Sequence, residues 1–158
     1  MDARILIVDD HEIVREGIRT LINRARPSWV IAGEAANGHE AISAVRALQP
    51  DVIILDITMP ELSGLEAAQQ LAKANVSSKI LMFTMHESQR LANDVREAGA
   101  QGLVLKSQAS RDLIVAIETL LSGGTFFPAP PTPDVPPSPT KFNPGNMLLR
   151  ALVFLPGF

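Results

Sequence analysis

Apolar residues along this chain follow two alternating patterns: short continuous runs, and longer stretches with helical spacing. The runs are rich in Val, Ile and Leu, which is typical of strands buried on both faces of a parallel sheet. The weakest run, at residues 29–35, is expected to lie at an edge of the sheet. The segments predicted as strands are residues 5–8, 29–35, 52–55, 80–83 and 103–105.

The stretches between these runs place apolar residues three and four positions apart, which predicts amphipathic helices. The predicted helices cover residues 12–25, 38–48, 65–74, 88–98 and 110–121. Gly99 comes directly after the fourth of them and predicts a left-handed helix cap. Because crossovers between parallel strands are right-handed, this alternation predicts an α/β fold with helices on both faces of one parallel sheet.

Polar residues suited to phosphate chemistry follow four of the predicted strands. Asp9 and Asp10 follow the first strand, Asp56 the third, Thr84 the fourth and Lys106 the fifth. Ligands of open α/β sheets bind at the carboxyl ends of the strands, so these side chains are expected to converge at one edge. Carboxylates attract a hard divalent cation, whereas an ammonium and a hydroxyl suit a phosphoryl group. The sequence therefore predicts a combined cation and phosphate site.

Composition narrows the classes of protein that fit this pattern. Of the 158 residues, 46% are apolar but only 4% are aromatic, which predicts an aliphatic core. A net charge of −3 argues against a dominant nucleic-acid footprint, and the absence of Cys excludes disulfides and thiolate metal sites. The chain begins with a strand pattern rather than a signal peptide, and no apolar stretch has the length of a membrane span. We therefore expect a cytoplasmic location and no membrane partner.

The composition changes near Gly124, which predicts a domain at residues 1–124 and a tail at residues 125–158. Eight prolines within residues 128–144 favour polyproline II or disorder, and residues 147–155 form a short apolar segment. The tail has one Lys and one Arg, too few phosphate contacts for a DNA-reading domain. Three interpretations stay open for the tail: a native extension that docks a partner, a linker, or a remnant left by truncation or a frameshift in a longer protein. We favour the remnant.

The chain from about Ala3 to Gly124 resembles the receiver domain of bacterial two-component response regulators, within the NarL/FixJ (LuxR-type) subfamily of transcriptional regulators. The matching features include the Asp9-Asp10 pair, the run D-I-T-M-P-E-L-S-G from residue 56, and the Thr and Lys after the last two strands. The stretches T-M-H-E-S from residue 84 and G-A-Q-G-L-V-L-K-S from residue 99 favour the subfamily. The resemblance implies a flavodoxin-like (βα)5 three-layer sandwich with parallel strand order 2-1-3-4-5, lacking the subfamily's C-terminal helix-turn-helix domain.

The resemblance also implies a metal site and a phosphoacceptor. Asp56 would receive a phosphoryl group from a sensor histidine kinase. Asp10, Asp56 and the backbone carbonyl of Thr58 would ligate Mg²⁺ directly, and Asp9 would act through a bound water. Three acids held together repel one another, and this repulsion favours a divalent cation.

A second group of residues would hold and sense the phosphoryl group. Lys106 would pair with one phosphoryl oxygen and Thr84 would hydrogen-bond another, while the backbone N–H groups of Thr58 and Met85 complete the cradle. Leu103 stands where many receivers have an aromatic residue that moves with the Thr. The implied function is a phosphorylation switch in a phosphorelay that regulates transcription, with a phosphorylation-dependent homodimer. Such a domain is no enzyme beyond its own autophosphorylation and autodephosphorylation.

Three alternatives compete with this interpretation. A phosphatase of the haloacid dehalogenase type needs a second Asp two residues after the nucleophile, where this chain has Thr58. A flavin-binding flavodoxin needs a phosphate loop rich in Thr, Ser and Gly, but the first strand here runs into D-D-H-E. A complete DNA-binding regulator conflicts with the charge and length of the tail. His11 and His86 are expected to be surface residues rather than ligands, and His39 to lie on a solvated helix face.

Overall fold

The computed structural model describes residues 2–86 and 88–128. The strands of this part of the chain are β1 (Arg4–Val8), β2 (Val30–Ala35), β3 (Val52–Asp56), β4 (Lys79–Thr84) and β5 (Gly102–Leu105). Its helices are α1 (Glu12–Ala25), α2 (Gly38–Leu48), α3 (Gly64–Lys73), α4 (Gln89–Glu97) and α5 (Ala109–Leu121), with a short 3₁₀ turn, η1 (Lys106–Gln108), before α5. Every predicted strand and helix is present, and the observed boundaries lie within one residue of the predicted ones.

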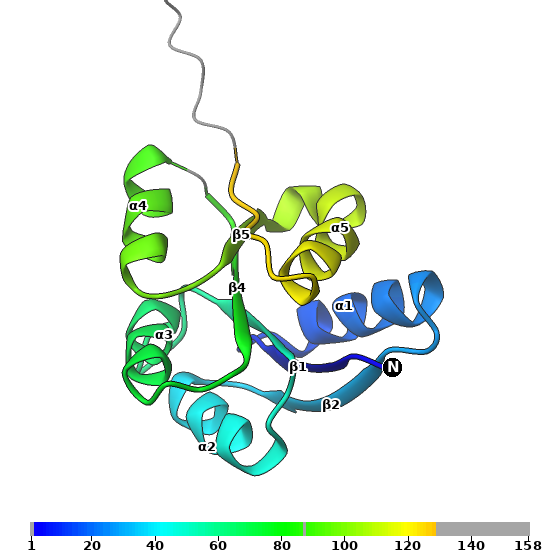
Figure 1. Cartoon of the computed structure of the whole chain (residues 1–158), viewed down its shortest axis with the longest axis horizontal. Helices are drawn as coiled ribbons and strands as arrows, with labels where there is room; N and C mark the ends of the chain where they lie inside the picture. The colour runs from blue at the N-terminus through cyan, green and yellow to red at the C-terminus, as the bar shows by residue number, and fades with distance from the viewer. Residues whose placement is uncertain (1, 87, 129–158) are drawn as a thin grey trace, which may run out of the picture. The chain divides into compact units, whose positions relative to one another are not determined.

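The five strands form one parallel sheet in the order β2-β1-β3-β4-β5. The predicted fold class and strand order are confirmed, and the weakest strand, β2, lies at an edge as expected. Helices α1 and α5 cover one face of the sheet, and α2, α3 and α4 cover the other (Figure 1). No helix in residues 2–86 and 88–128 is long and apolar enough to cross a membrane.

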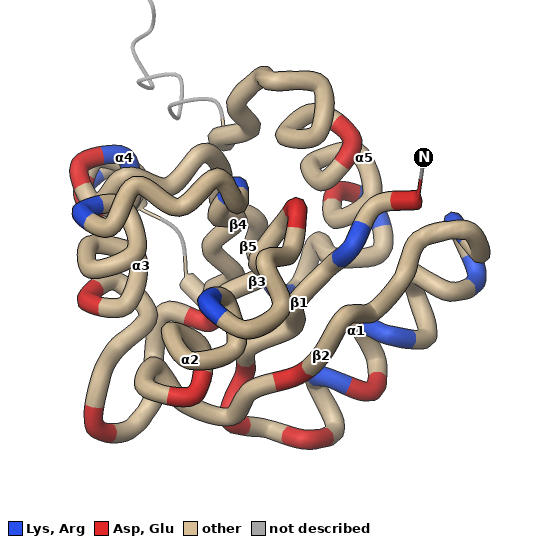
Figure 2. Tube along the Cα trace, turned by 60° about the horizontal axis from the view of Figure 1, so that its bottom comes forward, with Lys and Arg blue, Asp and Glu red and all other residues tan. Residues whose placement is uncertain are grey.

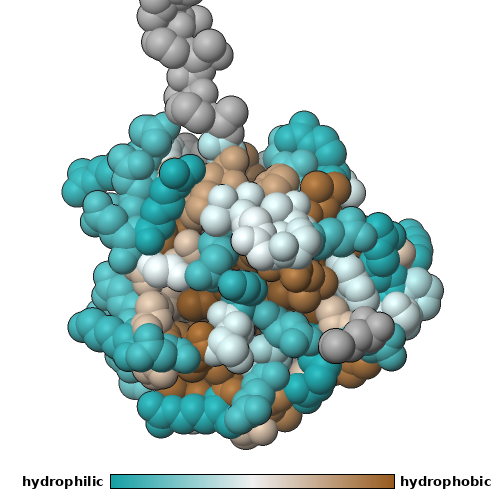
Figure 3. All heavy atoms as spheres, viewed as in Figure 1, coloured by the Kyte–Doolittle hydropathy of each residue, from teal (hydrophilic) through white to brown (hydrophobic). Residues whose placement is uncertain are grey.

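Two aliphatic cores lie on either side of the sheet because successive strand residues point to opposite faces. Leu6 and Val8 of β1 belong to the core under α2, α3 and α4, whereas Ile5 and Ile7 belong to the core under α1 and α5. All four side chains are buried, and each such burial stabilises the fold by roughly 1.5–3 kcal/mol. Figure 3 shows hydrophilic side chains over the outer surfaces of the helices and apolar side chains between them.

Polar caps begin three of the helices. The side chains of Asn37, Ser63 and Ser88 accept backbone hydrogen bonds at the starts of α2, α3 and α4. Such caps satisfy backbone N–H groups that have no partner within the helix. The cap of α1 is His11, whose side chain makes no capping hydrogen bond. At the C-terminal end of α4, Gly99 has a φ of +97°, which confirms the predicted left-handed cap.

The chain returns to the sheet after α5. Phe126 forms a parallel bridge beside Gly102: the N–H of Leu103 donates to the Phe126 carbonyl at 2.8 Å, and the N–H of Phe126 donates to the Gln101 carbonyl at 3.0 Å. Phe126 and Phe127 pack on opposite cores, and the segment runs beside β5 in Figure 1. The expected end of the fold near residue 124 is therefore too early for these two residues. The other predictions for the tail concern residues 129–158, which lie outside the described residues.

Candidate phosphate and cation site

The strand register brings the predicted polar residues to one level of the sheet. Val8 pairs with Leu55, so Asp9 and Asp56, which follow them, leave β1 and β3 side by side. Thr84 ends β4 opposite Leu105, and Lys106 follows directly in the turn after β5. Several acidic segments gather along the bottom of the view in Figure 2. The carboxyl ends of the central strands thus form an acidic edge with one lysine.

Lys106 lies between the two buried carboxylates. Its Nζ is 2.9 Å from Asp9 Oδ2 and 3.3 Å from Asp56 Oδ1. The side chain of Asp9 is 0% exposed, that of Asp56 5% and that of Lys106 12%. Although the ammonium is close enough for charge pairing, Asp9 Oδ2 accepts no well-directed hydrogen bond. Two buried carboxylates therefore share one cationic group, and the excess negative charge suits a metal cation.

The charge state of the two central groups reflects this crowding. Burial, and secondly the charge of Asp9, raise the pKa of the Asp56 carboxyl to about 6, although Lys106 and the N–H of Thr58 act in the opposite direction. Burial alone would lower the pKa of Lys106, but its pairing with the carboxylates of Asp9 and Asp56 outweighs burial and raises it. Lys106 is therefore ammonium at neutral pH, and Asp56 is an unusually basic carboxylate.

Asp10 and His11 extend the acidic edge toward solvent. His11 Nδ1 lies 3.1 Å from Asp10 Oδ1 and 3.3 Å from Asp9 Oδ1. Among the described residues, the potential ligand atoms that lie within 4.8 Å of one another come from Asp9, Asp10 and His11. Asp56 is not a member of this group and instead shares Lys106 with Asp9. The sequence predicted that His11 lies on the surface, and its side chain is 68% exposed. The contact of His11 with both acids was not predicted.

The other four predicted residues have different surroundings. The N–H of Thr58 donates to Asp56 Oδ1 at 3.4 Å. The hydroxyl of Thr84 donates to the carbonyl of His86 at 3.1 Å and accepts from its N–H at 3.3 Å, so it is engaged with its own loop. The side chain of Met85 is exposed, and Leu103, at the position of the aromatic residue, is buried in the core beneath α4.

Two residues without a predicted role hold this edge in place. Gly64 begins α3 so close to β3 that a Cβ atom there would lie 1.9 Å from the carbonyl oxygen of Asp56. Its N–H donates to the carbonyl of Ile57 at 2.8 Å, which closes the loop after β3. Arg15 of α1 donates to the carbonyl of Asp9 at 2.5 Å and pairs with Glu34 at 3.0 Å. Gly64 is the last residue of the D-I-T-M-P-E-L-S-G run, so the sequence did mark it. Its close approach to the backbone of Asp56 exists only in the folded loop and could not be predicted.

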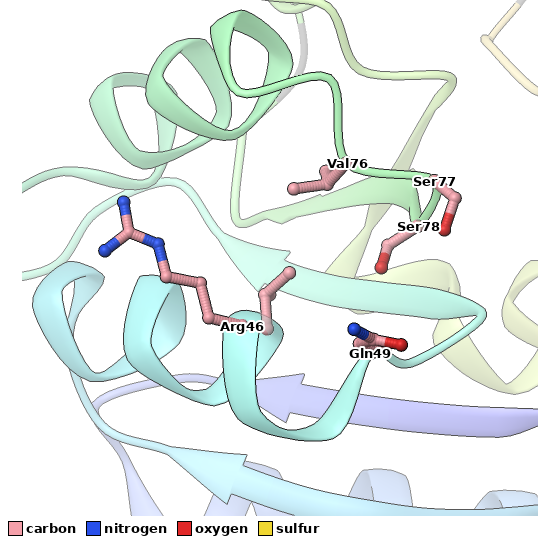
Figure 4. A pocket seen from close by; sticks show the side chains of 6 residues that line it. Arg46, Gln49, Val76, Ser77 and Ser78 are labelled. Atoms are coloured by element: carbon pink, nitrogen blue, oxygen red, sulfur yellow. The ribbon is translucent and has the colours of Figure 1, made fainter.

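A hollow of about 320 Å³ lies away from this site, between the end of α2 and the loop before β4. Figure 4 shows that the Arg46 guanidinium points away from the hydroxyls of Ser77 and Ser78. The Ser78 hydroxyl already donates to the carbonyl of Pro50 at 2.6 Å. The positive charge of Arg46 and the two hydroxyls do not point toward one another, so this hollow is not built to bind an anion. The acidic edge is therefore the candidate site.

Comparisons with known proteins agree with the chemistry of the acidic edge. The family model described as the response regulator receiver domain matches residues 5–118. The response regulator UvrY of Escherichia coli K12 is 38% identical over 123 residues, which make up 78% of this chain and 56% of UvrY. The nitrate/nitrite response regulator protein NarL of the same strain is 35% identical over 121 residues, or 77% of this chain and 56% of NarL. The chain thus matches little more than half the length of these relatives.

Solved structures show the same fold. A two-component response regulator of the LuxR family from Aurantimonas sp. SI85-9A1 has a TM-score of 0.76 and 42% identity, covering 80% of this chain and 89% of that one. The isolated REC domain of RcsB from Salmonella enterica serovar Typhimurium, solved with the phosphomimetic BeF₃⁻, has a TM-score of 0.73 and 27% identity. That match covers 81% of this chain and 94% of the RcsB domain.

Proposed function

Because this chain belongs to the response regulator receiver family, we propose that residues 2–128 accept one phosphoryl group on Asp56 and thereby switch conformation in two-component signalling. The observation that carries the assignment of Asp56 is its position: a buried carboxylate at the end of the central strand β3, beside the ammonium of Lys106. Asp9 is equally buried and could also be considered as the acceptor. Its Oδ1, however, already accepts a hydrogen bond from the backbone N–H of His11 at 2.8 Å.

Phosphoryl transfer to Asp56 needs positioning and charge neutralisation more than covalent assistance. An oxygen of the Asp56 carboxylate forms a bond to phosphorus while the phosphorus–nitrogen bond of the phosphohistidine donor breaks. The leaving imidazole takes up a proton from solvent. The ammonium of Lys106, 3.3 Å from Asp56 Oδ1, lies where it can pair with an oxygen of the transferred group. Before phosphorylation Lys106 thus acts as a counter-ion of Asp9 and Asp56, and after phosphorylation it binds the phosphoryl group.

The residues at this edge fit a divalent cation, and Mg²⁺ is the proposed one. Asp9 and Asp56 share the ammonium of Lys106, Asp10 follows Asp9 at the same edge, and the buried Asp9 Oδ2 lacks a well-directed hydrogen bond. Asp10, Asp56 and the carbonyl of Thr58 are the proposed direct ligands, with Asp9 acting through a water. When bound, the cation neutralises charge that develops on the phosphoryl oxygens.

The proposed switch begins at Thr84. Its hydroxyl is held by the backbone of His86, so it has to exchange these hydrogen bonds for one to a phosphoryl oxygen. Phosphorylation adds roughly −1.5 to −2 charges at the site, enough to bias a loop between two arrangements. Leu103 occupies the position of the usual aromatic residue and is buried, so in this chain the movement of Thr84 has to be passed on by aliphatic packing.

The role of the whole protein is a further part of the proposal. UvrY and NarL are named as response regulators, and the chain spans about half of their length. We propose that a sensor histidine kinase donates the phosphoryl group to this chain and that the output is regulation of transcription. We also propose that the phosphorylated chain forms a homodimer. Autophosphorylation from small phosphodonors and autodephosphorylation are the only reactions proposed. The proposed location is the cytoplasm, which would give the domain access to the kinase domain of a sensor histidine kinase.

The assignment is tested by labelling with a small phosphodonor. The protein is incubated with Mg²⁺ and acetyl phosphate, and its intact mass is measured. We expect wild type to gain one phosphoryl group and Asp56→Asn to gain none. Asp94→Asn, which changes an exposed acid of α4, is the matched control and should label like wild type. Labelling of Asp56→Asn at the wild-type level would exclude Asp56 as the acceptor.

A further inference from the structure

The chain leaves the compact domain along the outer edge of β5. This compact unit ends at Pro128, and we call residues 126–128 the exit segment. Because β5 is the last strand of the sheet, its outer edge is free to pair with the exit segment through the bridge of Phe126 and Gly102 (Figure 1). Gly102 leaves room for this approach, since a Cβ atom there would lie 3.0 Å from the carbonyl oxygen of Phe126.

Hydrogen bonds, apolar packing and a cation–π contact hold the exit segment. The N–H of Leu103 donates to the Phe126 carbonyl at 2.8 Å, and the N–H of Phe126 donates to the Gln101 carbonyl at 3.0 Å. Phe127 packs against the core beneath α2, α3 and α4. The guanidinium of Arg96, in the last turn of α4, lies over the Phe127 ring, 4.2 Å from its centroid. The exit segment therefore contacts both β5 and α4.

Leu103 links these contacts to the proposed switch. It occupies the position of the usual aromatic switch residue, and its side chain shares the core beneath α4 with Phe127. Its partner in the neighbouring strand is Met82, two residues before Thr84. One residue thus supplies the N–H group that holds the exit segment and the side chain that has to respond when Thr84 moves.

The contacts of the exit segment belong to the arrangement in which Thr84 hydrogen-bonds its own loop. Only four residues separate Thr84 from the first residue of α4, so a Thr84 that turns toward a phosphoryl oxygen displaces the start of this helix. Arg96 and Phe127 meet at the other end of α4. Close-packed side chains tolerate little displacement, so a shift of α4 against β5 disturbs the stacking and the bridge together.

We infer that the docked exit segment stabilises the unphosphorylated arrangement of α4 and β5, and that phosphorylation of Asp56 loosens the segment. The inference rests on the proposed function and states how the state of Asp56 reaches the chain at Pro128. Coupling between two sites is reciprocal. A change that weakens the docking of the exit segment therefore favours the phosphorylated arrangement.

Hydrogen exchange of single amides, measured by NMR on the full chain with Mg²⁺, tests this inference. BeF₃⁻ is the phosphoryl stand-in, and its bound fluorine signal reports occupancy of Asp56. A ligand of the native state slows exchange at amides that open only by global unfolding, such as those of β1 between β2 and β3. We expect BeF₃⁻ to slow the β1 amides but to accelerate exchange at the Leu103 and Phe126 amides at least about fivefold, the lower end of typical coupling.

Arg96→Gln tests the side-chain part of the contact. Glutamine keeps a high helix propensity but removes the cation, so exchange at the Leu103 and Phe126 amides without BeF₃⁻ should accelerate about two- to fivefold, as expected for an exposed cation–π pair. The affinity for BeF₃⁻ should rise by up to the same factor, because the lost contact belongs to the unphosphorylated arrangement. Arg90→Gln, which changes another exposed arginine of α4, is the matched control and should leave exchange and affinity unchanged.

Three results would overturn the inference and leave the proposed function intact. The first is a bound fluorine signal with unchanged or slower exchange at both amides. The second is an Arg96→Gln variant with unchanged exchange or unchanged BeF₃⁻ affinity. The third is equal acceleration by BeF₃⁻ in Asp56→Asn, which would show that the effect does not pass through Asp56. A wild type without any bound fluorine signal would instead refute the proposed function, and this inference with it.

Discussion

Asp56 meets two opposing demands at the scale of a single residue. As the proposed phosphoacceptor it has to be ionised, yet it is almost fully buried and lies near the carboxylate of Asp9. Both effects raise its pKa to about 6. A carboxylate with a raised pKa is also a stronger nucleophile once it is ionised. The fold therefore holds unfavourable negative charge at this position, and the proposed cation relieves it.

This stored charge predicts a pH-dependent stability in the absence of metal. The pKa of Asp56 is raised in the folded state from about 3.8, so its contribution to stability is fully present below pH 3.8 and is lost as pH rises through about 6. The loss has an upper bound of about 3 kcal/mol. Urea unfolding in EDTA should thus show Asp56→Asn gaining stability over wild type between pH 4 and pH 7. A difference that stays constant over this range would show that Asp56 does not titrate abnormally.

Asp10 is the residue whose loss separates metal binding from folding. It is a proposed direct ligand but is partly exposed and pairs only with His11 among the described ion pairs. Asp10→Ala should weaken Mg²⁺ binding strongly and Asp10→Asn less, because the amide retains one oxygen. Both variants should be at least as stable as wild type without metal, since one like charge is removed. Calorimetric titration with Mg²⁺ measures the first effect, and an unchanged affinity in Asp10→Ala would exclude direct ligation.

At the scale of elements, the connection from β3 to α3 decides where Asp56 points. A Cβ at Gly64 would overlap the carbonyl of Asp56, which is backbone and cannot move aside cheaply. Gly64→Ala should lower the free energy of unfolding by about 2–4 kcal/mol and reduce labelling of Asp56. Gly17→Ala in α1 is the matched control: nothing lies within 4 Å of its Cβ position, so it should be neutral or stabilising by up to about 1 kcal/mol. Equal stabilities of the two variants would mean that the loop can shift away from β3.

The elements themselves were largely predictable from the sequence because each has a strong local signal. Residues 52–55 are buried at every position, as the continuous apolar pattern predicted. Helix α3 begins at Gly64 behind the capping box of Ser63 and Glu66, close to the predicted start. The convergence of Asp9, Asp56 and Lys106 was predicted from their places after the carboxyl ends of parallel strands. The contact of His11 with both acids could not be predicted, since it depends on a side-chain rotation at a helix cap.

At the scale of the whole molecule, the end of the domain was harder to predict. Phe126 pairs with Gly102, far back along the chain, and nothing in the local pattern T-F-F-P signals a bridge to a strand. Prolines directly after it predicted only irregular structure. A parallel bridge of one residue is a tertiary feature, because its hydrogen bonds exist only once β5 has joined the sheet.

This bridge predicts different stabilities for two shortened chains. A chain ending at Gly124 loses both hydrogen bonds of Phe126 and the packing of Phe126 and Phe127, whereas one ending at Pro128 keeps them. Because both side chains are partly buried, the shorter chain should be less stable by about 1–3 kcal/mol. Urea unfolding monitored by circular dichroism measures the difference. If the two chains unfold at the same urea concentration, the bridge contributes nothing to the domain.

A force applied to the chain after Pro128 would act first on the parallel bridge between Phe126 and Gly102. Its two hydrogen bonds are anchored at Gln101 and Leu103, and Lys106 follows at the end of the same strand. Tension from that side therefore loads β5 before any other strand and acts on the strand that positions the ammonium between Asp9 and Asp56. A force applied to the chain after residue 128 would therefore act, through β5, on the position of the Lys106 ammonium between the two carboxylates.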